Sequence, residues 1–302
     1  MNTEILPAVA RSFPRHGPLI EVAPDIAAVQ TMIANVIFVG DPQRGSWVLV
    51  DAGMPFSAGK IRRAADLRFG PNARPRAIVL THGHFDHVGS LRALVDAWNV
   101  PVYAHRLEMP YLTGRAKYPP PDPTVGGGLF ARVSPTFPRG PFDFGDRLEP
   151  LPYSGEVPHM PGWRWVATPG HSPGHVSLFR DADRALIAGD AFVTTKQESF
   201  LAVMGQAPEM HGPPMYWTQD WESARESVVA LAALEPEIAV TGHGLPLRGE
   251  ALRTSLRDLA RNFDEVARPR DGRYVREPAI ADETGTYYLP PPVMYGSSIS
   301  CA

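Results

Sequence analysis

Three histidines and one aspartate, His82, His84, Asp86 and His87, stand within six residues of one another. They follow the apolar run Ala77–Leu80, which is typical of a buried strand. Several histidines buried together cost desolvation or mutual repulsion unless another group compensates them. A divalent cation does so, because neutral imidazole nitrogens and carboxylate oxygens are ligands for zinc and iron. The pattern therefore predicts a metal site at the end of a strand.

Short apolar runs alternate with amphipathic segments along much of the chain. The apolar runs predict buried strands at Ile33–Val39, Trp47–Val50, Ala77–Leu80, Val102–Ala104, Trp163–Ala167, Val176–Phe179, Ala185–Ile187 and Ile238–Val240. The amphipathic segments predict helices, two of them with an N-cap serine, at Ser57–Phe69, Ser90–Trp98, Trp221–Leu234 and Glu250–Val266. This alternation indicates an α/β fold with layers of both kinds of element.

Three more residues of metal-binding type, His171, Asp190 and His243, each stand just after a run that predicts a strand. Taken singly, a histidine in a turn or an aspartate after a glycine has an ordinary structural explanation. Four strand ends that all carry such residues favour one shared site. We expect that site on the loops at one edge of a sheet, where functional residues normally lie.

The ordered set of motifs resembles the metallo-β-lactamase superfamily over roughly Ile33 to Gly249. The H-x-H-x-D-H pattern followed by the three later residues is highly specific for that superfamily. The resemblance implies an α/β fold, a four-layer αββα sandwich with metals at one edge. We expect residues 1–302 to form one such domain, with a proline-rich insertion at about 111–161 and an extended C-terminal tail at 268–302.

The resemblance also implies seven ligands for two divalent metal ions. They are His82, His84 and His171 for the first metal, Asp86, His87 and His243 for the second, and Asp190 as the carboxylate that bridges both. Asp51 matches the aspartate that supports the ligands in this family. His175, four residues after His171, is expected to be a buried, hydrogen-bonded histidine rather than a ligand.

Zinc is the expected metal for this ligand set, although iron and manganese bind similar ligands. Two such metals would share a bridging water and lower its pKa, which gives hydroxide at pH 7. The site therefore predicts a metal-dependent hydrolase that acts on an ester, thioester or lactone-type bond of a small-molecule substrate. Asp86 is the candidate catalytic residue, which would orient the water or move protons.

Differences from known subfamilies reduce the range of candidate substrates. True β-lactamases commonly lack the bridging aspartate, so Asp190 argues against antibiotic hydrolysis. Quorum-signal lactonases place a tyrosine three residues after that aspartate, where this chain has Val193. Two alternatives stay open: a mononuclear-iron sulfur (persulfide) dioxygenase on the same fold, and a non-catalytic metal-binding module. The second would be marked by missing ligands, and the sequence has all seven.

Two proline-rich segments depart from the alternating pattern. Tyr111–Pro161 combines many of the 33 prolines with aromatic residues, which favours a lid near the site over a disordered linker. Arg268–Ala302 is expected to be an extended arm and is a candidate for a homodimer contact. A Met and aromatic set after Asp190 is interpreted mainly as core, with a substrate pocket as the alternative. Its members are Phe192, Phe200, Met204, Met210, Met215, Tyr216 and Trp217.

The net charge of −3 gives no reason to expect a nucleic-acid or anionic-membrane partner. No apolar run approaches the roughly 20 residues that span a bilayer, and the first residues lack a signal-peptide pattern. A cytoplasmic location is the default expectation. The single cysteine, Cys301, excludes an intramolecular disulfide and is expected to be incidental. His16 and His105 are expected to be structural, whereas His159 and His211 are candidates for lining a pocket.

Overall fold

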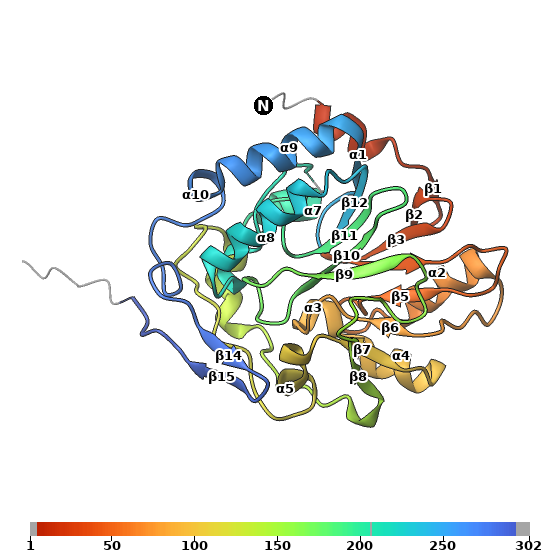
Figure 1. Cartoon of the computed structure of the whole chain (residues 1–302), viewed down its shortest axis with the longest axis horizontal. Coiled ribbons are helices and arrows are strands. Elements are labelled where there is room, and N and C mark those ends of the chain that lie inside the picture. The colour runs from red at the N-terminus through yellow and green to blue at the C-terminus, as the bar shows by residue number, and fades with distance from the viewer. Residues whose placement is uncertain (1–4, 206, 294–302) are drawn as a thin grey trace, which may run out of the picture.

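The computed structural model describes residues 5–205 and 207–293, so Cys301 lies outside the described residues. Two large β-sheets lie face to face, and each is covered by helices on its other side (Figure 1). In this view α9 lies above the strands β10–β12 with α8 beside them on the left, and α4 lies below β5 and β6. These are the four layers of an αββα sandwich, which confirms the predicted fold class.

The first sheet has eight strands in chain order, antiparallel from β1 to β5 and parallel from β5 to β8. Its strands are β1 (Arg15–His16), β2 (Leu19–Ala23), β3 (Ile26–Thr31), β4 (Ala34–Val39), β5 (Val48–Val50), β6 (Ile78–Val79), β7 (Val102–Ala104) and β8 (Leu148–Pro150). The parallel part needs crossover connections, and helices supply them. These are α2 (Ala58–Phe69) between β5 and β6, and α3 (Phe85–Val88) and α4 (Leu91–Trp98) between β6 and β7.

The second sheet has the strand order β13-β12-β11-β10-β9. Its strands are β9 (Trp163–Ala167), β10 (Val176–Arg180), β11 (Ala185–Gly189), β12 (Ile238–Thr241) and β13 (Leu247–Arg248). The outer helices α1 (Ile5–Arg11), α8 (Trp221–Ala233) and α9 (Gly249–Arg261) cover it. A separate hairpin of β14 (Ile280–Asp282) and β15 (Gly285–Tyr288) belongs to the C-terminal tail.

Side chains alternate between two hydrophobic layers along the buried strands, as the period of two in a strand requires. On β4, Val36 and Phe38 join the cluster that includes residues of α2 and α4. Ile37 and Val39, from the same strand, join the cluster between the two sheets, which continues into α8 and α9. Because both faces are buried, β4 reads as a continuous apolar run, and the sequence therefore identified it.

The predicted helix Glu250–Val266 is wrong in one respect, because it is divided. Asn262 leaves the helical conformation between α9 and α10 (Phe263–Val266). Ser57 and Ser90 occupy the predicted N-cap positions, but neither makes a side-chain capping bond. Instead Ser90 Oγ accepts a hydrogen bond from Ser57 N at 2.8 Å and ties the two helix starts together.

The proline-rich insertion contains the short helices α6 (Leu129–Val133), η2 (Ser134–Thr136) and η3 (Gly145–Arg147), and η1 (Arg106–Glu108) and α5 (Met109–Leu112) lead into it. It contributes to a third hydrophobic cluster, in which Tyr111 and Tyr118 pack with Phe85 from α3 and Trp217 from η4 (Met215–Trp217). A further short helix, α7 (Phe200–Gly205), lies between β11 and η4. The insertion therefore packs against the segment that carries the H-x-H-x-D-H motif.

Candidate metal centre

The fold brings all seven predicted ligands together. They form three overlapping groups whose ligand atoms lie within 4.8 Å of one another, namely His82, His84 and His171; His82, His87 and Asp190; and Asp86, His87 and His243. The first four ligands follow β6, and the other three follow β9, β11 and β12. The site therefore lies where the ends of strands from both sheets meet.

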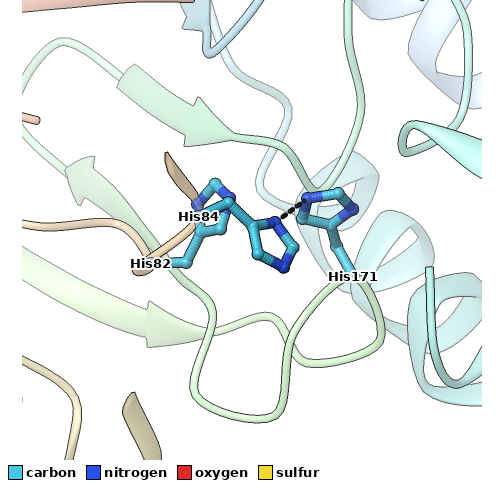
Figure 2. Close-up of side chains that lie close together, drawn as sticks. All are labelled: His82, His84 and His171. Carbon is cyan, nitrogen blue, oxygen red and sulfur yellow. Dashed lines mark hydrogen bonds between the residues drawn. The ribbon is translucent and has the colours of Figure 1, made fainter. Parts of the chain in front are cut away.

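Figure 2 shows three histidines of the first group, His82, His84 and His171. His84 Nδ1 faces His171 Nε2 at 2.9 Å, although the two residues come from different sheets. Nε2 of His82 is buried and has no hydrogen-bond partner. The imidazole nitrogens of three residues thus lie close together, and few hydrogen bonds within the protein satisfy them. A cation bound between them would supply the missing partner.

Asp190 lies at the junction of the groups. Its Oδ2 is 3.1 Å from His243 Nε2, 3.4 Å from His171 Nε2 and 3.6 Å from His87 Nε2. Its Oδ1 is buried without a hydrogen-bond partner. Gly242 leaves the space for this carboxylate, because a Cβ there would come within 1.9 Å of Asp190 Oδ1.

Burial sets the protonation state of the first group. Burial lowers the pKa of His82 and of His84 well below the usual histidine value, and the neighbouring histidines lower both further. Burial likewise lowers the pKa of His171 to about 3. These imidazoles are therefore neutral at pH 7, which is the form that binds a metal.

The other two groups of the site contain its carboxylates, Asp86 and Asp190. Burial alone would lower the pKa of His87 and of His243, but Asp190 and Asp86 raise both above the usual value. Burial would raise the pKa of Asp190, yet His243 and His87 hold it well below its usual range. Carboxylates surrounded by imidazoles, with ligand atoms left unpaired, fit a divalent cation by the chemistry of the donor set.

Hydrogen bonds outside the ligand set fix the direction of two rings. His87 Nδ1 donates to Asp51 Oδ2 at 2.9 Å, and His243 Nδ1 donates to the carbonyl oxygen of Ile33 at 2.8 Å. In the neutral, metal-binding form of each ring, Nε2 is then the nitrogen with the free lone pair, and it points into the site. Asp51 also accepts hydrogen bonds from Thr81 N and Thr81 Oγ1, both at 2.8 Å.

The prediction for His175 is confirmed. His175 Nε2 accepts a hydrogen bond from Asp190 N at 2.8 Å, and Nδ1 lies 2.8 Å from Thr168 Oγ1. Burial lowers its pKa to about 4, so the ring is neutral. His175 therefore supports the backbone of Asp190 and does not belong to the groups that could hold a metal.

The remaining histidines lie outside the three groups. His16 and His159 are exposed, and His105 accepts a hydrogen bond from Leu107 N at 3.3 Å. His211 is buried, with Nδ1 at 3.3 Å from the carbonyl oxygen of Gly212. His159 does line a cavity of about 570 Å³, but that cavity contains none of the seven predicted ligands.

The structure separates the Met and aromatic set that follows Asp190. Phe192 and Met210 belong to the core between the sheets, as the main interpretation predicted, whereas Phe200 and Met204 are exposed. Trp217 lies at the site, with its ring 4.6 Å from the ring of His84. Tyr216 and the half-buried Met215 pack beside it in the third cluster.

Glu108 is the residue at this site that the sequence did not reveal. Its side chain is fully buried, and it accepts hydrogen bonds from Gly83 N and Gly174 N at 2.9 and 2.8 Å. These two glycines belong to the loops that carry His84 and His171. The one available signal was its place, since Glu108 also follows a predicted strand, Val102–Ala104.

Comparison with known proteins now decides the family. The model of the metallo-beta-lactamase superfamily matches residues 30–243. The chain belongs to this superfamily. Its sequence is 48% identical over 253 residues to the "Probable metallo-hydrolase YflN" of Bacillus subtilis, covering 83% of this chain and 96% of that protein.

Solved structures agree on the fold of this superfamily member. A metallo-β-lactamase of Cronobacter sakazakii is similar with a TM-score of 0.56 and 19% identity, covering 87% of this chain and 96% of that one. A B3 metallo-β-lactamase with an active-site glutamic acid gives a TM-score of 0.55 at 20% identity, covering 87% and 92% of the two chains. At such identities the likeness shows the fold alone. Among residues 5–205 and 207–293, the helices are too short or too polar to cross a bilayer.

Proposed function

We propose that this protein is a hydrolase that binds two divalent metal ions, zinc in the first instance, and cleaves an ester, thioester or lactone-type bond in a small molecule. The observation that carries the proposal is the position of Asp190. Its Oδ2 lies within 3.6 Å of His171, which is expected to bind the first ion, and of His87 and His243, which are expected to bind the second. A carboxylate so placed would be suited to bridge two ions, one that His82, His84 and His171 would hold and one that Asp86, His87 and His243 would hold.

Two bound ions would supply a water of lowered pKa and a Lewis acid for the oxygen of the scissile group. The residues of the chain would direct that chemistry. Asp86 is 8% exposed, more than any of the other six predicted ligands, so it is the one best placed to meet an incoming molecule. Its Oδ2 lies 3.4 Å from His243 Nε2, and we propose that it orients the attacking water and accepts its proton.

Aromatic side chains around the site favour an apolar substrate group. The rings of Tyr118 and Trp217 lie 4.7 and 4.6 Å from the ring of His84. Asp86, Glu198 and Asp190 add to burial in raising the pKa of Tyr216 well above its usual value. Tyr216 therefore stays protonated and can donate a hydrogen bond. An uncharged acyl group with an aromatic or aliphatic body fits these surroundings better than a phosphorylated one.

The test is the metal content per chain of protein purified without chelator or added metal, followed by turnover of ester, thioester and lactone substrates. About two ions per chain together with turnover that a chelator abolishes is the expected result. One tightly held iron with persulfide-dependent oxygen uptake would replace the hydrolase with the dioxygenase. Two ions with no turnover of any substrate class would instead support a non-catalytic module.

A further inference from the structure

Glu108 is a buried carboxylate that the proposed chemistry does not use. It ends η1 and precedes the first residue of α5, just before the proline-rich insertion. Burial raises its pKa, and its hydrogen bonds partly offset that shift. A carboxylate is expensive to bury, so a fully buried one with several donors around it indicates a specific arrangement.

Each oxygen of Glu108 accepts two hydrogen bonds. Oε2 accepts from Gly83 N at 2.9 Å and from the hydroxyl of Tyr118. Oε1 accepts from Ser172 Oγ and from Gly174 N, both at 2.8 Å. Gly83 lies between His82 and His84, while Ser172 is the residue after His171. One carboxylate thus binds both loops that supply the three-histidine group.

The glycines of the two loops make the space for this contact. A Cβ on Gly83 would lie 2.3 Å from the hydroxyl of Tyr118. A Cβ on Gly174 would lie 2.8 Å from Glu108 N and 2.9 Å from Glu108 Cγ. Real Cβ atoms do not approach other atoms this closely, so an alanine at either position would push Glu108 or Tyr118 away. The backbone of both ligand loops is therefore shaped to receive these two side chains.

Tyr118 extends the same network into the insertion. Its ring stacks on Tyr111 with centroids 4.1 Å apart and packs edge-on against His84 at 4.7 Å. Tyr118 is 1% exposed, and burial with the charge of Glu108 raises its pKa well above the usual value. It therefore keeps its proton and donates to Glu108.

We propose that Glu108 is a positioning residue for the three-histidine group. It holds the loop of His82 and His84 in a fixed position relative to the loop of His171. Through its hydrogen bond with Tyr118 it also connects both loops to the insertion. This inference rests on the proposed metal site. Metal ligands need support from neighbouring hydrogen bonds, and loss of such support typically weakens metal binding by about 10–100-fold.

The decisive variant is Glu108→Gln, which keeps the shape and removes acceptors at one end. A Gln amide nitrogen cannot accept a hydrogen bond, so in either orientation it faces a backbone N–H, that of Gly83 or that of Gly174. Release of metal to a chelator is the readout. We expect one ion per chain to leave at least about tenfold faster than in the wild type, and the other at an unchanged rate. The cobalt-loaded protein should also show an altered visible spectrum.

Asp122→Asn is the matched control. Asp122 is a buried carboxylate within the insertion, and it accepts hydrogen bonds from Thr124 N, Thr124 Oγ1 and Arg273 N. Among the described residues, its side chain bonds to neither ligand loop. Its substitution should lower the melting temperature yet leave metal release and the cobalt spectrum unchanged, which separates positioning of ligands from general stability.

Tyr118→Phe is the milder variant, and it decides the matter if Glu108→Gln does not fold. It removes one donor and keeps both backbone contacts of Glu108, so we expect about threefold faster release of the same ion. Unchanged release in both variants, or equal acceleration in Asp122→Asn, would overturn the inference and leave the metal site intact. A wild-type protein that binds no ions would overturn the proposed function and this inference together.

Discussion

The two halves of the metal centre are built in different ways. Four candidate ligands, His82, His84, Asp86 and His87, come from one loop and the short helix α3 that follows it. His171, Asp190 and His243 come from three separate strand ends of the second sheet. The first half is defined by a few consecutive residues, whereas the second exists only once β9, β11 and β12 are side by side.

Each half accordingly has its own kind of support. Asp51 holds the first half through His87 and Thr81, all within the first sheet and its loops. The second half is tied to the first sheet across the sandwich, because Asn35 Nδ2 donates to the carbonyl oxygens of Thr241 and Gly244 at 2.9 and 2.7 Å. The local half depends on short-range bonds, and the dispersed half depends on correct packing of the two sheets.

Asp190 belongs to the dispersed half and also contacts His87 of the local half, so its loss should have the largest effect. Asp190→Ala removes a carboxylate oxygen within 3.6 Å of three histidines. We expect metal content to fall for both ions and kcat/KM to drop by about a thousandfold or more. Metal analysis and steady-state kinetics on the same preparation measure the two effects.

Asp181→Ala is the control for that experiment. Asp181 lies in the turn between β10 and β11, is exposed, and pairs with Arg164 at 2.9 Å. An exposed ion pair contributes little, so this variant should behave as the wild type. Full hydrolysis by a correctly folded Asp190→Ala protein would contradict the assignment of Asp190 as the bridge.

Asp51→Asn tests the support of the local half. Asp51 has a φ of 62°, which asparagine also tolerates, so the backbone should not change. With its oxygen accepting from Thr81 N, the new amide would place its N–H₂ group toward His87 Nδ1 and misdirect that ring. We expect metal affinity to fall about 10–100-fold at the site of His87.

Titration of metal into the metal-free Asp51→Asn protein provides the measurement. The three-histidine group has no direct bond to Asp51 apart from the shared Thr81, so its ion should bind with nearly normal affinity. Equal weakening of both ions would show that Asp51 supports the whole site rather than the ligands around His87.

Asn35→Ala tests the support of the dispersed half. It leaves the buried carbonyl oxygens of Thr241 and Gly244 without their side-chain donor, which should lower the free energy of unfolding by about 1–3 kcal/mol. His243 keeps its bond to Ile33, so metal affinity should change only a few-fold. Denaturant unfolding of the metal-free protein measures the first effect, and metal titration the second. A large loss of affinity without loss of stability would refute this division of roles.

The same contrast explains what could be predicted from the sequence. Strands buried on both faces, such as β4 and β11, stand out as apolar runs and were predicted. The bounds predicted for β7 and β9 are the observed ones, although β9 is only partly buried. The short strands β1, β8, β13, β14 and β15 have no such signal and were missed. The strands β2 and β3 were also missed, although most of their residues are buried. The break at Asn262 was hidden because Leu259 and Phe263 stay buried on either side of it, so the apolar period continues through the break.

The site was predictable as far as its chemistry is carried by rare residue types. Histidines at strand ends are unusual, and they revealed every member of the three groups. Glu108 is different, because a glutamate in a helical turn is an ordinary surface residue in sequence. Its partners Gly83 and Gly174 lie 25 and 66 positions away, so only the tertiary structure shows that it is buried between two ligand loops.

The smallest effect is expected at Phe137 of the insertion, which packs against the segment of the local half without a hydrogen bond to a ligand. The ring of Phe137 lies 5.3 Å from that of Phe85, which stands between His84 and Asp86, and 6.2 Å from that of Tyr216. Phe137→Ala should loosen this contact and raise KM for apolar substrates several-fold, because an aromatic pair contributes about 0.5–1.5 kcal/mol beyond its buried area. Metal content and kcat should stay unchanged, since no hydrogen bond to a ligand is lost.

Steady-state kinetics with a short and a long acyl substrate measure the change in KM, and the exposed Phe56 offers a matched control as Phe56→Ala. Loss of metal in Phe137→Ala would mean that the insertion holds the ligands directly, whereas identical KM values would remove it from substrate access.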